Sequence, residues 1–566
     1  MISDSFDELS ELMLKAFLDI NPDVATVFGK HDPYDMRLPH GGLKKLQDNL
    51  EILESWLSEA RAIAASEELS QDQQVSLELL RMSADVQRFA IEDYPLWRMY
   101  PDALEMRGTV MLLMTLRDYA PYEERLAGIS SQLGELPRYL DQYRSRFDRH
   151  RPVRLWTEMA IETCMHFPEF LKQIERNSAG RVVNSLYLDL KRNIALAEEE
   201  IRNHLEWLRQ ILQDATEYVP MGREKFAKLM RVRGMVFTPE QMLSLAETYL
   251  AELKAERLKI AKRLSTSGTL EDAYKTVRGH CPETFEGVLE ATRKEIDKAK
   301  GYIIEKDLAT VDESAVLRVI ETPSFLAPVM SSAALFMPAR FETVQTGIYL
   351  ETRPSNAEDM RSVWNYGSII NTTVHEAYPG HFLQGVRSNA KPWMHQLPHM
   401  LMSPDTMVTS YESQEGWAHY CEKMMYERGY EATDEAALAM IDGGIWRACR
   451  VVYDIRLSFG NASLEDMIQL LMRESNMPRG PAEGDVKGFS RTPGYPVSYM
   501  IGRHLVLELR RELETRLGDD FDEKRYHDLL AENGNLPFYV LKDVVSYDMV
   551  SAPPSAQMRA RRKPDT

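Results

Sequence analysis

Residues 375–381 read HEAYPGH, and this stretch decides how the rest of the chain is interpreted. A common helical zinc site has the pattern HExxH, in which two histidines share one helix face and the glutamate acts as general base. Here His381 follows His375 by six residues, not four. A straight helix turns about 600° over six residues, so the two imidazoles would lie on well-separated faces.

The residues between the two histidines suggest how the pattern is repaired. Pro379 has no backbone N–H, and its ring clashes with the preceding helical turn. Gly380 can adopt backbone conformations closed to other residues. We therefore predict a distorted helix at 378–380 that brings His381 back beside His375. The alternative is an ordinary histidine pair near a helix end, with no metal.

A second segment, residues 410–425, reads SYESQEGWAHYCEKMM and carries further candidate polar groups. Glu415, His419 and Glu422 share one helical face through steps of four and three. Burying such groups without partners would be costly, and a metal or its ligands would supply those partners. The alternative is a solvated amphipathic face, which the neighbouring aromatic residues disfavour. Two further charged residues of this segment are expected to be solvated: Glu412 and Lys423.

A third segment, residues 492–511, reads TPGYPVSYMIGRHLVLELRR and predicts a Pro/Gly-rich turn followed by a helix. Tyr495 and Tyr499 could donate hydrogen bonds to an oxyanion, and Arg503 could bind a substrate carboxylate through two parallel hydrogen bonds. The alternative is that these side chains serve only packing and ion pairing.

The remaining pattern predicts a mainly α fold. A helix should begin at 238–241, where Thr-Pro-Glu-Gln forms a capping box, and end near Leu264. Short strands are expected at 316–322 and 344–350, just before the HE segment. The least ordered internal stretch is expected at 476–488, which is rich in Pro and Gly.

The domain organisation that we expect is one continuous catalytic fold over residues 1–566, with two helical lobes and a small β-sheet beside the active-site helix. The N-terminal lobe is expected to cover residues 1–230. The lobe that carries the metal site is expected to cover residues 231–566, with a flexible tail at 558–566.

Composition excludes several classes of partner. The net charge of −19 disfavours nucleic acid and anionic membranes, because both repel an acidic surface. The N-terminus lacks the features of a secretory signal, and no apolar stretch is long enough for a membrane span, so we expect a cytoplasmic protein. The spacing of the cysteines predicts neither thiolate zinc nor a disulfide scaffold: Cys164, Cys281, Cys421 and Cys449.

Taken together, these motifs resemble the bacterial domain-of-unknown-function 885 family. The matching segments span nearly the whole chain: FLDINPDVATVFGKHDPYDMRLP at 17–39, HEAYPGHFLQ at 375–384, EGWAHYCE at 415–422 and PGYPVSYMIGRHLVLELR at 493–510. That family is similar to the mostly helical gluzincin peptidases. The resemblance implies one zinc ion per chain, with His375, His381 and Glu415 as ligands and Glu376 as general base. Contacts to the substrate or to the metal ligands are expected from Gln384, His419, Glu422, Tyr495 and Arg503.

The function that we expect is therefore a zinc-dependent hydrolase, a peptidase acting on short peptides. Glu376 would take a proton from a water activated by zinc, and Tyr499 would stabilise the oxyanion. The strand at 344–350 is expected to pair with extended substrate backbone. A hydrolase of a non-peptide amide or ester, and a non-enzymatic helical binding protein with a degenerate site, remain as alternatives. Manganese or cobalt would also suit a His/His/Glu set, and the oligomeric state is not predicted.

Overall fold

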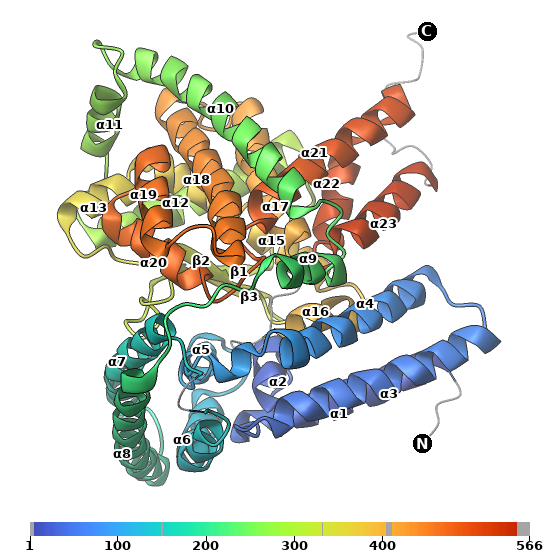
Figure 1. Cartoon of the computed structure of the whole chain (residues 1–566), viewed down its shortest axis with the longest axis vertical. Helices are drawn as coiled ribbons and strands as arrows, with labels where there is room; N and C mark the ends of the chain where they lie inside the picture. The colour runs from blue at the N-terminus through green and yellow to red at the C-terminus, as the bar shows by residue number, and fades with distance from the viewer. Residues whose placement is uncertain (1–4, 149–150, 331, 403–409, 552–566) are drawn as a thin grey trace.

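The computed structural model describes residues 5–148, 151–330, 332–402 and 410–551, so the tail expected at 558–566 lies outside the described residues. The fold is mainly helical with one small sheet, as the sequence predicts (Figure 1). No helix within the described part is both long and apolar enough to cross a membrane. The first helices are α1 (Phe6–Ile20), α2 (Pro22–Phe28), α3 (Lys44–Ser66), α4 (Gln71–Arg88), α5 (Glu105–Leu116), α6 (Tyr122–Arg144), α7 (Arg154–Ser178), α8 (Asn184–Asp214) and α9 (Arg223–Val232).

The later helices include α14, α15, α17 and α21, which carry or border the sequence motifs. The helix α10 begins at Pro239 with the predicted capping box on Thr238 and ends at Leu264, which confirms the prediction. The others are α11 (Leu270–Gly279), α12 (Phe285–Lys306), α13 (Ala357–Val363), α14 (Tyr366–Glu376), α15 (His381–Ser388), α16 (Leu397–Met400), α17 (Glu412–Glu427), α18 (Asp434–Phe459), α19 (Leu464–Ser475), α20 (Arg479–Phe489), α21 (Ser498–Leu517), α22 (Glu523–Glu532) and α23 (Phe538–Ser551).

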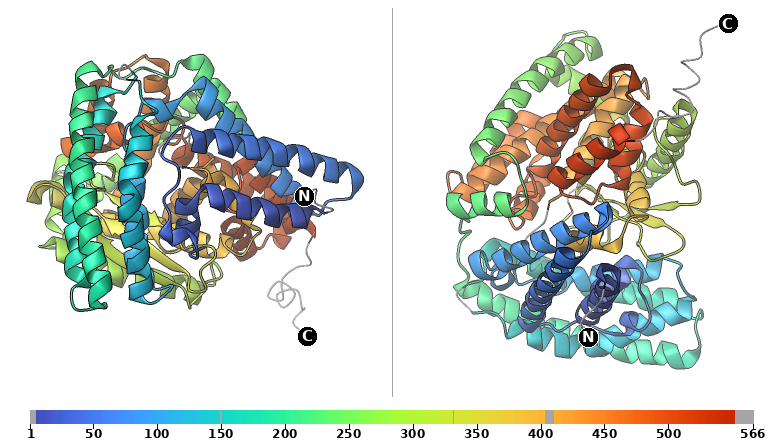
Figure 2. Two further views of the ribbon diagram at one scale, coloured as in Figure 1. Left: turned by 90° about the horizontal axis from the view of Figure 1, so that it is seen from below. Right: turned by 90° about the vertical axis from the view of Figure 1, so that its right-hand side faces the viewer.

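The helices form two layers with the sheet between them. In Figure 1, α1 to α8 occupy the lower half together with α16, which lies beside α4, and the other helices from α10 on occupy the upper half; the right-hand view of Figure 2 shows the same division. The layers share their hydrophobic cores. One core joins α1, α3 and α4 to Trp393 and Leu397, and another joins α5 to α8 to Phe325 and to strand residues. The two layers therefore pack as one continuous structure.

The sheet has the strand order β1–β3–β2. The strands are β1 (Val316–Glu321), β2 (Ala333–Phe336) and β3 (Thr346–Glu351), so the two predicted strands are confirmed within two residues at either end. The central strand β3 runs parallel to β1 and antiparallel to β2. The expectation that this strand pairs with substrate is therefore wrong, because both of its edges are already hydrogen-bonded.

Burial explains why β3 is central. All of its residues are buried, and successive side chains point to opposite faces of the sheet. Ile348 and Leu350 enter the core of the N-terminal layer, whereas Tyr349 enters the core of the C-terminal layer. A strand covered on both faces by helices belongs in the middle of its sheet.

The segment expected to be least ordered instead forms a helix. Residues 479–489 make up α20, and its buried positions include Ala482 and Val486. The buried carboxylate of Asp485 accepts hydrogen bonds from Arg450 and from the Tyr453 hydroxyl. Contacts with α18 thus fix a segment whose local sequence, rich in Pro and Gly, favours a loop.

Two motif-bearing helices, α17 and α21, cross with their backbones in contact. A Cβ atom added to Gly416 would lie 2.3 Å from the carbonyl carbon of Gly502. One added to Gly502 would lie 2.2 Å from the carbonyl oxygen of Glu412. Because both obstacles are backbone atoms, neither glycine can be replaced without moving a helix. This crossing sets the distance between Glu415 on α17 and Tyr499 on α21.

We predict that Gly502→Ala lowers the free energy of unfolding by about 1–3 kcal/mol, because the added methyl group forces apart two packed helices. Denaturant unfolding followed by circular dichroism measures the change. Gly301→Ala is the matched control. At this exposed helical position no described atom beyond its own helix lies within 4 Å of the added Cβ, so it should stabilise by about 0.4–1 kcal/mol. Equal effects of the two substitutions would contradict the proposed contact.

Candidate metal centre

The predicted helix distortion is confirmed. The helix α14 ends at Glu376 and α15 begins at His381, with a non-helical turn between them. At Gly380 a Cβ atom would lie 1.8 Å from the carbonyl oxygen of His375. Its φ is −66°, so glycine is required here by close approach and not by a left-handed backbone. The indole of Trp417 donates a 2.9 Å hydrogen bond to the Pro379 carbonyl and so ties the turn to α17.

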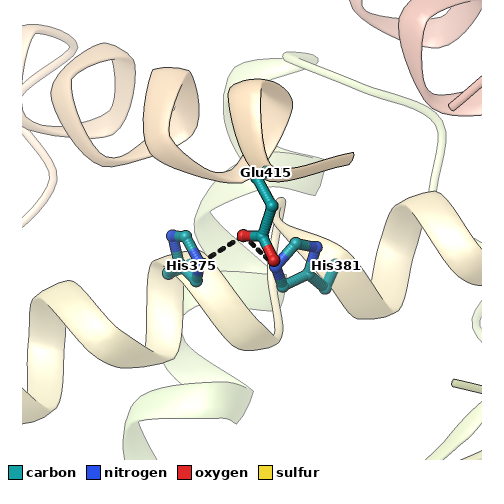
Figure 3. Close-up of side chains that lie close together, drawn as sticks. All are labelled: His375, His381 and Glu415. Atoms are coloured by element: carbon teal, nitrogen blue, oxygen red, sulfur yellow. Dashed lines mark ion pairs between the residues drawn. The ribbon is translucent and has the colours of Figure 1, made fainter. Parts of the chain in front are cut away.

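The turn brings both histidines to one carboxylate, as Figure 3 shows. The Nε2 atom of His375 lies 3.5 Å from Oε2 of Glu415, and the Nε2 atom of His381 lies 3.3 Å from the same oxygen. The two imidazole rings are 4.8 Å apart and nearly perpendicular. One ligand atom from each of these three buried residues can be chosen so that all lie within 4.8 Å of one another. The structure thus groups the three predicted metal ligands.

A second carboxylate, Glu422 on α17, orients His375. Its Oε1 atom lies 2.8 Å from Nδ1 of His375, which leaves Nε2 directed at Glu415. The amide of Asn371 donates a 2.9 Å hydrogen bond to the other oxygen, and Arg447 lies 3.2 Å from Oε1. Burial alone would raise the pKa of Glu422, but the charge of Arg447 holds it well below its usual range. Carboxylate–histidine pairs of this kind fix the tautomer of metal ligands.

His419 completes this buried group without facing the three ligands. Its Nδ1 atom lies 3.3 Å from Oε1 of Glu422. Burial lowers the pKa of His419 to about 4, so the ring is neutral at ordinary pH. His419 was expected to contact the substrate or the metal ligands, but its hydrogen-bonding contact is with Glu422, and it is not among the residues that line the large cavity described below.

The two predicted tyrosines occupy different places around Glu415. The hydroxyl of Tyr495 donates a hydrogen bond to Oε1 of Glu415 and so holds the carboxylate. Tyr499 stacks on His375, with ring centres 6.3 Å apart, and its hydroxyl lies 3.5 Å from that of Tyr495. Burial raises the pKa of Tyr499, which therefore stays protonated and able to donate a hydrogen bond. Of the two, Tyr499 is the one whose hydroxyl is not engaged with Glu415.

The candidate metal-binding group, His375, His381 and Glu415, opens into a large cavity between the two helical layers. Its volume is about 550 Å³. The walls come from α2 and α5 of the N-terminal layer, from β2, and from α14 to α18, α20 and α21. Val27, Phe28 and Leu113 contribute to a mostly apolar lining. Glu376 lines the cavity beside His375, and among the described residues no hydrogen bond or ion pair restrains its carboxylate.

Other residues singled out in the sequence lie elsewhere. Arg503 is buried on α21 and is not part of the cavity lining. Gln384 donates a 3.2 Å hydrogen bond to the Ser413 carbonyl and so joins α15 to α17, outside the cavity. The expectation that Glu412 is solvated is wrong: it is 3% exposed and pairs at 2.7 Å with Arg233. Lys423 is partly exposed and pairs with Glu427.

Sequence reasoning missed the polar residues of α18. The stretch IWRACRVVYDI places Arg447, Arg450 and Asp454 among apolar residues of a long helix. Arginine is rarely buried without a partner, so two arginines three residues apart in such a helix are a usable signal for a polar site. Asn371 carried no comparable signal, because a single asparagine on a helix is ordinary.

The residues fit a divalent metal. Oε2 of Glu415 is fully buried, and among the described residues no hydrogen bond reaches it. The two nearest polar atoms are the Nε2 atoms of His375 and His381, at distances too long for strong hydrogen bonds. An acceptor oxygen and two imidazole nitrogens facing one point, with Glu422 and Tyr495 behind them, form a donor set that zinc prefers.

Comparison with known proteins places the chain in a family. It belongs to the family described as bacterial protein of unknown function (DUF885), which matches residues 22–545. No curated protein matches the chain at a significant level. The result confirms the family resemblance drawn from the motifs, and the family's description assigns no activity.

Two solved structures share the fold. One, described as a putative lipoprotein of unknown function from Shewanella oneidensis, is 21% identical with a TM-score of 0.72, covering 96% of this chain and all of its own. The other, described as a putative lipoprotein from Colwellia psychrerythraea, is 16% identical with a TM-score of 0.78, covering 98% of this chain and all of its own. At these identities the likeness concerns the fold alone.

We predict that Glu422→Gln weakens metal binding by about 10- to 100-fold, because His375 loses the carboxylate that orients its ring. Zinc titration in competition with a chromophoric chelator measures the affinity. Glu427→Gln, at the exposed end of the same helix, is the matched control and should bind zinc as the parent protein does. Unchanged affinity in a folded Glu422→Gln protein would contradict the assigned role.

Proposed function

We propose that this protein is a zinc-dependent hydrolase, most simply a peptidase that cleaves short peptides. One observation carries the proposal. His375, His381 and Glu415 converge on one point, and the unrestrained carboxylate of Glu376 lines the same cavity. A buried group that can hold a metal, next to a free base in a cavity large enough for a small substrate, is the arrangement that metal-assisted hydrolysis requires.

The chemistry that a bound zinc ion would supply is Lewis acidity, which makes water a better nucleophile near neutral pH and polarises a carbonyl group. His375, His381 and Glu415 would hold the ion. Glu422 and Tyr495 would keep two of these ligands in place, each through a hydrogen bond to the side remote from the ion.

Glu376 would act as the proton carrier. It would accept a proton from the attacking water and deliver that proton to the amine that leaves. Its position as the residue next to His375 at the end of α14 keeps it close to the metal-binding group. Tyr499 would donate a hydrogen bond to the oxygen on which negative charge develops, since its hydroxyl remains protonated.

The substrate backbone would lie along β2 and not along β3. Within the described residues β2 pairs with β3 alone, and residues 333–338 line the cavity. An edge strand can add an extended peptide through backbone hydrogen bonds. This arrangement supports a peptide substrate over an ester or a simple amide, because those molecules offer no repeating backbone for the strand to pair with.

We expect Glu376→Gln to keep its zinc and to lose at least about 10²-fold in kcat, because the amide cannot accept the proton. Metal content by mass spectrometry and peptide cleavage by liquid chromatography measure the two properties. The parent protein should lose activity to a chelator and regain it with zinc. A fully active Glu376→Gln protein would contradict the proposed role of Glu376 as general base.

Tyr499→Phe should lower kcat by about 10²–10³-fold with little change in KM, because it removes one donor to the developing oxyanion. Zinc affinity serves as its control measurement. Because Tyr499 makes no hydrogen bond to the three ligands, that affinity should stay close to the parent value. A parallel loss of zinc would instead assign Tyr499 a structural role.

Measurements on the same purified protein distinguish the alternative functions and metals. Cleavage of amides or esters but of no peptide would favour a hydrolase of another substrate class. Substoichiometric metal that does not respond to His375→Ala would favour a binding protein with a degenerate site. Restoration by manganese or cobalt, and not by zinc, would revise the metal. The cytoplasmic location expected from the sequence stays a prediction.

A further inference from the structure

The arginines that line the large cavity differ in how many of their N–H groups already donate hydrogen bonds to the protein. Arg117 donates through both amino groups, to the carbonyls of Val27 and Met337 at 2.6 and 2.8 Å. Arg491 is held by both oxygens of Glu105 and by the Tyr100 hydroxyl. In both cases protein groups engage both amino groups of the guanidinium. These two arginines therefore serve mainly to join the helical layers.

Arg450 is different. Its Nη2 and Nε atoms face Asp485, at 2.5 and 3.4 Å, but no described residue accepts a hydrogen bond from Nη1. The residue is 5% exposed and lines the cavity, and Nη1 is not sealed from solvent. The solvent that this amino group meets is therefore the solvent of the cavity. A guanidinium has five N–H donors, so a ligand can still be bound through Nη1.

Aromatic rings fix the direction of this guanidinium. Its central carbon lies 4.1 Å from the ring centre of Trp446, 4.5 Å from that of Phe489 and 4.4 Å from that of Tyr499. Together with Asp485 they leave the side chain little rotational freedom. A donor that is already ordered loses little entropy when it binds a ligand, which favours specific recognition.

The guanidinium is also close to the metal-binding group. The Tyr499 ring that it contacts stacks on the ring of His375, with centres 6.3 Å apart. An extended peptide advances about 3.4 Å per residue. Arg450 is thus within about three residues of extended chain from a carbonyl group held at the metal-binding group.

We propose that Arg450 binds the free C-terminal carboxylate of the substrate, so that the protein removes fragments of one to three residues from the C-terminus of short peptides. This inference rests on the proposed peptidase function and adds the end of the peptide from which residues are removed. Charge-assisted hydrogen bonds between guanidinium and carboxylate are among the strongest in proteins. The mostly apolar cavity lining favours apolar side chains near the cleaved bond.

The charged groups of the cavity disfavour removal of residues from the N-terminus of a peptide. A substrate amino terminus would need a free carboxylate. Asp485 is paired with Arg450, and Glu415 is engaged by Tyr495 and the two histidines. Glu376 is the carboxylate left without such a partner, and an ammonium group bound there would occupy the proposed base.

The first test uses the metal-loaded parent protein and a matched pair of peptides, N-acetyl-Ala-Ala-Phe and its C-terminal amide. The free acid should be cleaved with a kcat/KM about 10- to 100-fold higher, which is the range for one hydrogen bond between charged groups. Equal rates for acid and amide would overturn the role of Arg450 and leave the peptidase proposal standing.

The second test assigns the preference to a residue. The double variant Arg450→Gln/Asp485→Asn removes both charges together, which avoids leaving a buried carboxylate unpaired. Its acid-to-amide ratio should fall to about one, mainly through a higher KM for the acid. Arg503→Gln, a buried arginine outside the cavity, is the matched control and should keep the parent ratio. A folded double variant with an unchanged ratio would overturn the inference.

A binding measurement keeps the two proposals separate. Calorimetry with the zinc-loaded Glu376→Gln protein compares N-acetyl-Ala-Phe with its amide in the absence of turnover. A preference for the acid that disappears in the Arg450→Gln/Asp485→Asn background supports the carboxylate site, even if the parent protein cleaves no peptide. The absence of peptide cleavage would count against the proposed function alone. Equal affinities for the acid and the amide would count against Arg450 alone.

Discussion

The contact between Gly380 and the carbonyl of His375 is the constraint on which the candidate site depends. Only hydrogen can occupy the position of the missing side chain, because a Cβ atom there would overlap the carbonyl oxygen at 1.8 Å. That closeness allows the chain to leave α14 and start α15 within four residues, and so to set His381 beside His375. Trp417 then anchors the turn from the helix that carries Glu415.

From this turn the polar contacts extend through three helices and the segment that precedes α21. Glu422 on α17 accepts from His375 and Asn371 on α14 and pairs with Arg447 on α18. Glu415, also on α17, accepts from Tyr495, which precedes α21. A buried charge with one partner removed is costly, so each member of this network depends on the others. The glycine crossing of α17 and α21 permits the short distances that the network needs.

Much of this could be predicted from the sequence, and the reasons are local. The turn at 378–380 follows from proline and glycine chemistry, and the start of α10 from its capping box. The grouping of His375, His381 and Glu415 came from motif resemblance, and the structure agrees with it. The turn and the capping box depend on residues within a few positions of one another, where side-chain chemistry restricts the backbone directly, whereas only the motif resemblance connected Glu415 with the two histidines.

What could not be predicted depends on contacts between distant segments. The pattern at 344–350 predicted a strand that pairs with substrate, yet β3 lies between β1 and β2 and helices from both layers cover it. The Pro/Gly-rich stretch before Phe489 forms a helix because Asp485 meets Arg450 and Tyr453 on α18. Arg503 and Arg450 look alike in sequence, and only the packing of α18 and α21 decides which one reaches the cavity.

The burial of β3 between two cores has a consequence for how such a protein can evolve. The proposed ligands His375, His381 and Glu415 and the proposed base Glu376 lie in the C-terminal half, so a gene shortened to that half would still encode the complete candidate site. It would lack the wall that α2 and α5 contribute, and Ile348 and Leu350 would lose the core that covers them. Exposed strand surface of this kind promotes aggregation. We therefore expect the two layers to be retained together in evolution, although the residues of the candidate site are encoded in only one of them.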